Sequence, residues 1–192
     1  GALLSNLSYH HADLVFIKNI DNVIPDDPRV ANHQSTTVRY KKLLGGMLLY
    51  LQKEIFSMVE LLNTRIPTDE ELMYIEDFMS NRLCIDISRA KAAPQKEKLR
   101  MLLGKLNRPL RVCGMVKNQG EPGGGPFWVV NGDGTKSLQI VESSQINRKN
   151  SGQEAILQQS THFNPVDLAC SYKSYNGRHF ALQNYVDPTT GF

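Results

Sequence analysis

Hydrophobic residues in the N-terminal half of the chain recur at steps of three and four, the spacing of an amphipathic helix. A stripe of Leu, Met, Ile and Val predicts a long helix from near Ser35 or Thr36, both suitable caps, to about Leu62. We interpret this Met-rich stripe as core rather than ligand-binding surface. Gly45 and Gly46 fall inside it; each weakens a helix by about 1 kcal/mol relative to Ala, but each also permits close approach of another element.

Two more helices are marked by their first residues. Thr68 and Glu71 form a capping-box pattern, which predicts a helix reaching about Met79. Pro94 suits the first position of a helix that runs through Leu106, with leucines along one face.

From Pro109 onward the pattern changes to that of β-strands. Asn131-Gly132-Asp133-Gly134 separates two strand-like runs, and both Asn-Gly and Asp-Gly favour a hairpin. Asn176-Gly177 separates a second possible pair. Residues 2–7 are expected to form the end of a helix. The expected strands are residues 14–18, 83–87, 110–117, 127–130, 137–142, 166–172 and 178–182.

The strand at 14–18 ends in a group of polar residues. Its continuous apolar run predicts a strand buried on both faces, and Asn19-Ile20-Asp21-Asn22 follows directly before Pro25. Ligands of open α/β sheets bind at the carboxyl ends of strands. A carboxylate between two amides there suits a hard cation or a ribose. The alternative is an Asx-rich turn that simply ends the strand.

Three successive glycines, Gly123, Gly124 and Gly125, lie between two predicted strands. Such a loop lets the backbone approach a ligand and offers N–H groups to an anion. It is neither a Walker loop nor a Gly-x-Gly-x-x-Gly turn before a helix, and a mobile loop is the alternative. Lys117, just upstream, either reaches a phosphate as a point charge or is an ordinary surface lysine.

Glu142 continues the apolar face of its strand, because residues 138, 140 and 142 point the same way. With the serines that follow and Gln145, it offers the donors and acceptors that sugar hydroxyls need. The alternative is a strand end that turns polar without a ligand. Residues 162–167 form a third polar cluster, whereas His10, His11 and His33 lack metal-ligand spacing and are interpreted as surface residues.

Composition narrows the class of protein. The chain has 192 residues, 41% of them hydrophobic and 21% charged, and its net charge of +3 is too small to indicate nucleic acid or an anionic membrane as a partner. No apolar run approaches the roughly 20 residues of a membrane span. Residues 1–8 do not read as a signal peptide, and Cys84, Cys113 and Cys170 form no CxxC pair, so we expect a cytoplasmic protein.

Several of these segments resemble a known enzyme family. Phe16-Ile17-Lys18-Asn19-Ile20-Asp21-Asn22 is similar to the strand-end Asn-x-Asp-Asn motif of UDP-sugar pyrophosphorylases. Residues 1–7 resemble the tail of that family's Pro-x-Gly-His-Gly-x-Leu segment, and residues 138–146 resemble its Leu-Glu-x-x-Gln-Val strand. Residues 161–164 fall where that family has an Asn-rich segment.

A closer resemblance, covering nearly the whole chain, is to an uncharacterised bacterial family, a domain of unknown function whose members are longer than this sequence. It is carried by residues 111–118, by the following Gly-Glu-Pro-Gly-Gly-Gly-Pro-Phe-Trp, and by Asn164-Pro165-Val166-Asp167-Leu168. We therefore expect an incomplete fragment of a longer protein, either one α/β domain or part of one. Residues 1–107 would be mainly helical with one core strand, and residues 108–192 β-rich.

The pyrophosphorylase resemblance implies an α/β fold of the nucleotide-diphospho-sugar transferase type, with a mixed, mainly parallel sheet flanked by helices. It implies Mg²⁺-dependent nucleotidyl transfer between a nucleoside triphosphate and a sugar 1-phosphate, so a nucleotide or nucleotide-sugar would be the partner. Under this resemblance, Asp21 would hold the metal ion, and Lys117 and Lys173 would be the catalytic residues. The substrate would be bound by Asn19, Asn22, Gly123, Gly124, Gly125, Glu142, Gln145 and Asn164.

The sequence also departs from that family. The family's Gly-Gly-x-Gly-Thr-Arg loop is absent, Pro165 replaces an Asn, and Lys173 lies only near the position of the expected lysine. The alternative is a non-catalytic module that binds a nucleotide-sugar or a glycan. A glycosyltransferase is disfavoured, because the chain has no Asp-x-Asp.

Overall fold

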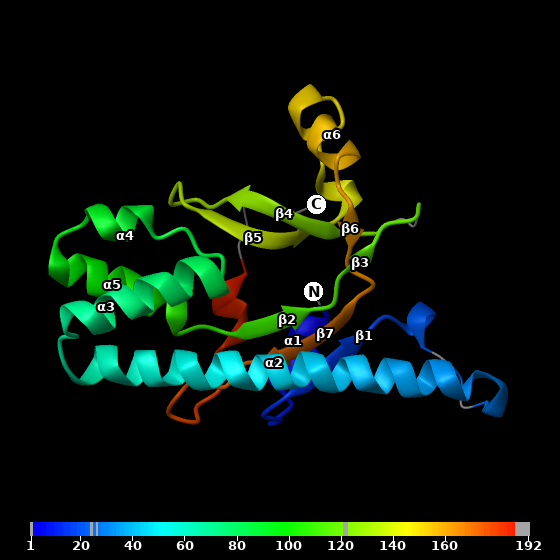
Figure 1. Ribbon diagram of the computed structural model, residues 1–192, viewed down its shortest axis with the longest axis horizontal. Coiled ribbons are helices and arrows are strands. Elements are labelled where there is room, and N and C mark those ends of the chain that lie inside the picture. Colours follow the sequence, from blue (N-terminus) through cyan, green and yellow to red (C-terminus); the bar gives the residue numbers. More distant parts are fainter. Residues whose placement is uncertain (1, 24, 26, 121–122, 187–192) are drawn as a thin grey trace.

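The computed structural model of the protein describes residues 2–23, 25, 27–120 and 123–186 (Figure 1). A long helix runs beneath a small sheet, shorter helices gather at one end of it, and a β-hairpin lies above. The α-helices are α1 (Ala2–Ser8), α2 (Ala31–Thr64), α3 (Asp69–Asp77), α4 (Ser88–Ala92), α5 (Gln95–Leu106) and α6 (Ser151–Gln158). The strands are β1 (Val15–Lys18), β2 (Leu110–Cys113), β3 (Val116–Lys117), β4 (Gly125–Val130), β5 (Lys136–Val141), β6 (His162–Phe163) and β7 (Asp167–Ser171).

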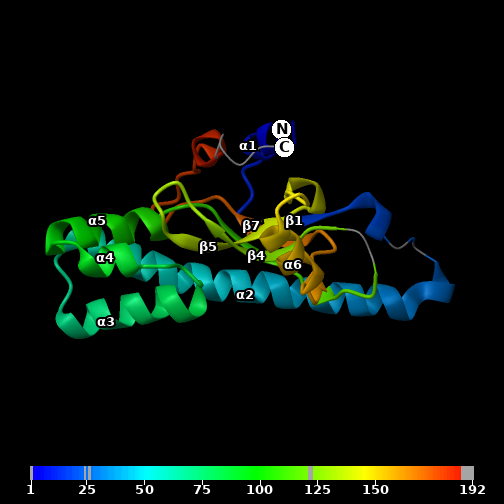
Figure 2. The ribbon, with the colours of Figure 1, turned by 90° about the horizontal axis from the view of Figure 1, so that it is seen from above.

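Helix α2 spans most of the molecule and begins earlier than the sequence predicts (Figures 1 and 2). A 3₁₀ turn at Pro28–Val30 leads into it, and the Asp27 side chain accepts a hydrogen bond from Arg29 N. Ser35 and Thr36 do not cap it: both hydroxyls donate to the Asn32 carbonyl from within the helix. Within the described residues, α2 included, no helix combines the length and the apolar character needed to cross a bilayer.

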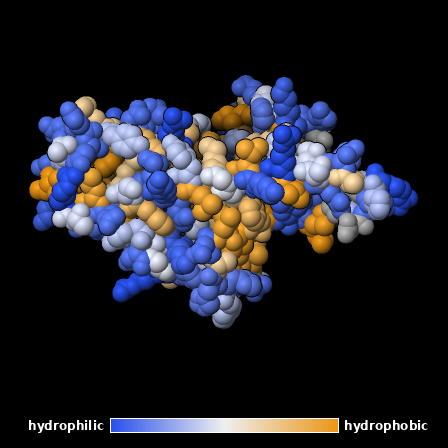
Figure 3. All heavy atoms as spheres, turned by 60° about the horizontal axis from the view of Figure 1, so that its bottom comes forward, coloured by the Kyte–Doolittle hydropathy of each residue, from blue (hydrophilic) through white to orange (hydrophobic). Residues whose placement is uncertain are grey.

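The core confirms most of the predicted stripe. Residues of α2 pack against α3, α5 and the turns beside them, and this buried cluster is Leu51, Ile55, Met58, Val59, Ile75, Phe78, Met79, Ile87, Ala90, Leu102 and Leu106. The N-terminal part of the stripe is different, because Leu43 and Met47 are 62% and 55% exposed. Hydrophobic side chains therefore also reach the surface, as the orange areas of Figure 3 show.

The sheets are small, and their described strand pairs are antiparallel. Strand β7 lies between β1 and β2 and is antiparallel to both, β3 pairs with β6, and β4 pairs with β5. The fold is therefore mixed α/β, but the pairing is not the mainly parallel one expected. Strands β1 and β2 run in the same direction without pairing to each other, and β1 joins a sheet formed by the C-terminal part of the chain.

Strand β1 is an edge of its sheet in the described structure, not a strand buried on both faces. Phe16 is 41% exposed, although the run is apolar. The sheet contacts α2 on the side where Gly45 lies, and a Cβ there would come within 2.9 Å of Phe16 Cζ. Gly45 thus permits the close approach that the sequence suggested. Gly46 does not, since nothing lies within 4 Å of its Cβ position.

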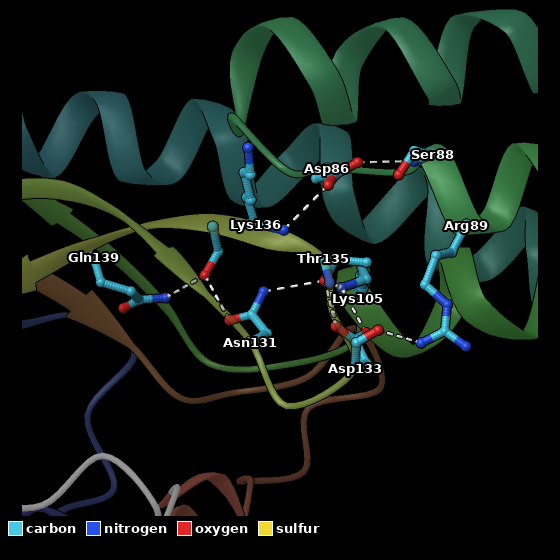
Figure 4. Close-up of polar contacts among 10 residues, drawn as sticks. Asp86, Ser88, Arg89, Lys105, Asn131, Asp133, Thr135, Lys136 and Gln139 are labelled. Carbon is cyan, nitrogen blue, oxygen red and sulfur yellow. Dashed lines mark hydrogen bonds and ion pairs between the residues drawn. The ribbon is translucent and has the colours of Figure 1, made fainter. Parts of the chain in front are cut away.

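The hairpin at Asn131–Gly134 is confirmed, with β4 and β5 paired from Gly125–Val141 to Val130–Lys136. Its tip is fixed to the helical layer by the polar network of Figure 4. Buried Thr135 accepts from Lys105 Nζ at 3.0 Å, and Asp86 accepts from Lys136 N at 3.1 Å. The Thr135 hydroxyl donates to Asp133, which lowers the pKa of that carboxyl to about 2.

Three predicted strands are wrong in part. Residues 83–87 make only an isolated bridge, Ile85 to Ser137, because a π-helical turn at Phe78–Arg82 extends α3 to just before them. The strand at 110–117 is broken into β2 and β3. Residues 178–182 form no strand. Within them, His179 makes only an isolated bridge with Lys173, and a 3₁₀ turn follows at Leu182–Tyr185.

Candidate functional site

The turn Asn164–Asp167 connects several of the segments singled out in the sequence. Asn164 is 5% exposed; its Nδ2 donates to Gly114 O at 2.6 Å, and its Oδ1 accepts from Val166 N at 3.1 Å. Its backbone N donates to Gly124 O at 2.7 Å. Gly114 N in turn donates to Asp167 O at 2.8 Å, directly after the last pair of β2 with β7, Cys113 with Leu168. Asn164 therefore ties the end of β2 and the glycine loop to one point.

The other side of this turn holds the segment that follows β1. Asn22 Nδ2 donates to Pro165 O at 2.6 Å, and Asn19 N donates to Val166 O at 3.1 Å. Asn19 Nδ2 also lies 3.4 Å from Asp21 Oδ2, and Asn19, Asp21 and Asn22 are all exposed. The polar residues after β1 are thus structured by long-range contacts and not only by a local Asx turn.

Val166 has a φ of 54°, in the left-handed region that β-branched residues rarely occupy. Such conformations cost about 1–3 kcal/mol and persist only where surrounding contacts impose them. Here the hydrogen bonds of Asn164, Asn19 and Asn22 act on the two sides of this residue. The next residue, Asp167, is consequently held in a defined position at the start of β7.

Two lysines from different elements converge on Asp167. Lys18, at the end of β1, lies 3.4 Å from Asp167 Oδ2, and Lys41, on α2, lies 3.7 Å from Asp167 Oδ1. The three side chains, which we call the lysine–aspartate cluster, are 17%, 27% and 18% exposed for Lys18, Lys41 and Asp167. Asp167 Oδ1 is buried without a hydrogen-bond partner, since 3.7 Å exceeds hydrogen-bond length.

Phe16 helps to place the second lysine. The Lys41 ammonium lies 5.7 Å from the centre of the Phe16 ring, within the range of a cation–π contact. The same ring lies against Gly45, one turn further along α2. Strand β1 and helix α2 therefore position Lys41 together. Sequence reasoning missed Lys41, because a lysine on a helix has no local signal that marks it; Lys18 and Asp167 stand within motifs that were noted but were not assigned a role.

The glycine loop and Glu142 lie next to each other. A Cβ on Gly124 would come within 2.6 Å of Glu142 Oε1, so the carboxylate occupies the space that a side chain at 124 would need. Ser143 Oγ donates to Gly123 O at 3.1 Å, and Glu142 N donates to Gln145 Oε1 at 2.9 Å. Gly125 fits against the His162 carbonyl, at 3.1 Å from its Cβ position. These predicted residues form one contiguous group that reaches Asn164.

The two predicted catalytic lysines lie apart from each other. Lys117 is exposed on β3, opposite His162 of β6, close in the chain to the glycine loop. Lys173 follows the far end of β7 and pairs with Asp13, which precedes β1. This partner lowers the pKa of the Asp13 carboxyl. Lys173 is therefore at the opposite end of the sheet from the lysine–aspartate cluster.

The fit of Mg²⁺ depends on a single carboxylate, that of Asp21. Among the described residues no group of three or more His, Cys, Asp or Glu could hold a metal ion. Mg²⁺ often needs only one or two carboxylates, with phosphate oxygens and waters completing its shell. Exposed Asp21 is suited to that mode. Asp167 is less suited, because two ammonium groups already stand beside it.

The charges of the lysine–aspartate cluster favour an anion. Two ammonium groups against one carboxylate leave one positive charge at a partly buried place, where electrostatic interactions are less screened than in open solvent. Lysine binds phosphate as a point charge. The charge of this cluster is therefore suited to an anion at the carboxyl end of β1.

The fold and site define a mixed α/β protein with a basic cluster at a strand end. The family model described as Domain of unknown function (DUF4301) matches residues 1–192, and the chain belongs to this family. No curated protein and no solved structure matches the chain. The family membership confirms the closer of the two resemblances, whereas the similarity to pyrophosphorylases stays a prediction.

Proposed function

We propose that this protein is a sugar-1-phosphate nucleotidyltransferase-like protein that binds the phosphates of a nucleotide or nucleotide-sugar at the lysine–aspartate cluster. The observation that carries the proposal is the convergence of Lys18 and Lys41 on Asp167 at the carboxyl end of β1.

In nucleotidyl transfer, a phosphate oxygen of the sugar 1-phosphate attacks the α-phosphorus of the triphosphate, the α–β P–O bond breaks, and pyrophosphate leaves. Catalysis consists mainly of positioning and of stabilising charge on the phosphate oxygens. Lys18 and Lys41 would supply that charge, and Lys117 would approach from the side of the glycine loop. Asn19, Asn22, Gln145 and Glu142 would bind hydroxyls. Mg²⁺, held by Asp21 and phosphate oxygens, would neutralise further charge.

The test is a calorimetric titration with UTP in the presence of MgCl₂, using Lys18→Gln and Lys41→Gln. Each variant loses a charged hydrogen bond worth about 1.5–3 kcal/mol, so affinity should fall about tenfold or more. Lys42→Gln is the matched control, because Lys42 is the exposed neighbour of Lys41 on α2. Equal affinity of all three variants and wild type would refute the site.

The alternative function is a non-catalytic module that binds a nucleotide-sugar. It is favoured by the packing of Glu142 against Gly124, because this contact explains the glycine at that position by packing alone and requires no catalytic role for the loop. Pyrophosphate release from UTP and a sugar 1-phosphate separates the two functions. If wild type releases pyrophosphate and Asp21→Ala does not, the result supports nucleotidyl transfer. If UTP binding depends on Lys41 but no pyrophosphate is released, the result supports the binding module.

A further inference from the structure

A pocket lies at the other end of β2 from the lysine–aspartate cluster. Its volume is about 270 Å³, close to the lower end of the range of about 300–1,000 Å³ typical of small-molecule sites. Its walls come from α2, from the segment after α3, from the end of α5 and from the beginning of β2. Apolar side chains, among them Leu51 and Ile55 of α2, line its floor.

Four cationic side chains also line this pocket: Arg82, Lys105, Arg108 and Arg111. No acidic residue is among its lining residues in the described structure. We call this site the basic pocket.

Two of these four cations, Arg108 and Arg111, contact neutral partners. Arg111 Nη2 donates to Gln139 Oε1 at 3.2 Å, and the Arg108 guanidinium lies 5.8 Å from the centre of the Tyr185 ring. Because neither an amide nor an aromatic ring carries a net charge, both contacts fix the side chain and leave its positive charge uncompensated.

Lys105 is the member of the pocket that has an acidic partner. Its Nζ lies 3.0 Å from Thr135 Oγ1 and 3.4 Å from Asp133 Oδ2 (Figure 4). Asp133 offsets one of the four positive charges and Asp86 also interacts with Lys105, so the basic pocket and these two neighbours keep a net charge of about +2. Like charges gathered beside an apolar floor repel one another, and an anion placed between them relieves that repulsion.

We propose that the basic pocket binds a small organic anion that has an apolar body, with its carboxylate, phosphate or sulfonate at the arginines and its body on the leucine and isoleucine floor. The two parts of the ligand match the two parts of the lining. An inorganic anion would leave the floor exposed to water, and a neutral apolar molecule would leave the cations unpaired. This site is separate from the proposed nucleotide site and does not depend on it.

The probe is 8-anilinonaphthalene-1-sulfonate, an apolar dye with one negative charge, followed by its fluorescence. The variants are Arg108→Gln and Arg111→Gln, and Arg100→Gln is the matched control, because Arg100 is an exposed arginine of α5 outside the pocket. We expect the dye's Kd to rise about fivefold or more in each pocket variant and to stay unchanged in Arg100→Gln. Thermal unfolding of each variant shows that it is folded.

Two further experiments test whether binding depends on the charge of the dye or only on its apolar body, and which class of anion the pocket prefers. N-phenyl-1-naphthylamine, the uncharged relative of the dye, should bind more weakly and should not respond to the arginine substitutions. Competition by decanoate or by AMP identifies a fatty or a nucleotide anion, and inorganic phosphate should not compete. Equal binding of both dyes, or an identical dye Kd in the Arg108, Arg111 and Arg100 variants, would overturn the proposal.

Discussion

Two adjacent glycines of helix α2 give a sharp test of how strand β1 packs on the helix. Gly45 and Gly46 are adjacent in the chain, and both stand inside the helix. Replacing Gly by Ala in a helix interior is worth about 1 kcal/mol. Nothing lies within 4 Å of a Cβ at Gly46, so Gly46→Ala should realise the whole gain. For a chain of this size that corresponds to a rise in Tm of about 2–4 °C.

Gly45→Ala must give a different result. The new Cβ would lie 2.9 Å from Phe16 Cζ and 3.4 Å from Leu14 Cδ2, and overpacking of this kind costs about 1–3 kcal/mol. Phe16 is 41% exposed and its ring can move outward, so we take the lower part of that range. The cost then about cancels the helical gain. Gly45→Ala should be at least about 1 kcal/mol less stable than Gly46→Ala.

The measurement is urea unfolding followed by far-ultraviolet circular dichroism and by the fluorescence of Trp128, the single tryptophan. Repeating both substitutions in a Phe16→Ala background completes a double-mutant cycle. Without the ring, Gly45→Ala should approach the stability gain of Gly46→Ala. If Gly45→Ala stabilises the wild-type protein as much as Gly46→Ala does, the contact between β1 and α2 is not as described, and the placement of Lys41 by Phe16 fails with it.

Three other predictions concern stability. Asn164→Ala should cost about 2–4 kcal/mol in urea unfolding, because it leaves the Gly114 carbonyl and a backbone N–H without their partner; no loss would contradict its connecting role. Thr68→Ala should lower stability by about 1 kcal/mol through loss of the capping box, with Thr68→Ser as the conservative control. The folded pKa of Asp133 is about 2, below its ordinary 3.8, so its contribution is present above about pH 4 and is lost as pH falls toward 2. Asp133→Asn should flatten stability over that pH range, and an unchanged profile would refute this.

Local signals predicted the local structure well. The capping box at Thr68 and Glu71 and the hairpin at Asn131–Gly134 are each specified by a few neighbouring residues, and both are confirmed. The predicted long helix is present too, but its predicted start near Ser35 or Thr36 is wrong, because α2 begins at Ala31. Asp27 and Pro28 offered a cap and a first helical turn that the apolar periodicity, which begins later, did not reveal.

Strand pairing could not be read in the same way. The apolar run of β1 indicates a strand, but not its partner or its place in a sheet, and its partner is β7, near the other end of the chain. At the end of β2, likewise, Gly114 O accepts a hydrogen bond from the side chain of Asn164, 50 positions further along the chain. Periodicity describes which face of a segment is apolar and carries no information on which distant segment covers that face.

The same distinction explains the candidate site. Asn19, Asn22 and Asn164 were found because polar side chains at a strand end are conspicuous, and the structure brings them together at one turn. The lysine–aspartate cluster has no such signature. Lys18 and Asp167 are 149 positions apart, and Lys41 comes from a third element, so their joint charge exists only in the folded chain.

Position within the fold is therefore what turns ordinary lysines into a candidate anion site. Lys41 and Lys42 are neighbours on α2, yet only Lys41 meets Phe16 and Asp167. A turn held by Asn164 fixes Asp167, and Asp167 holds the two ammonium groups near each other against their mutual repulsion. Under the proposed function, a bound phosphate would take over that compensation, since it would offer the lysines more negative charge than one carboxylate does. The carboxylate thus keeps the cluster assembled in the free protein and leaves it attractive to an anion.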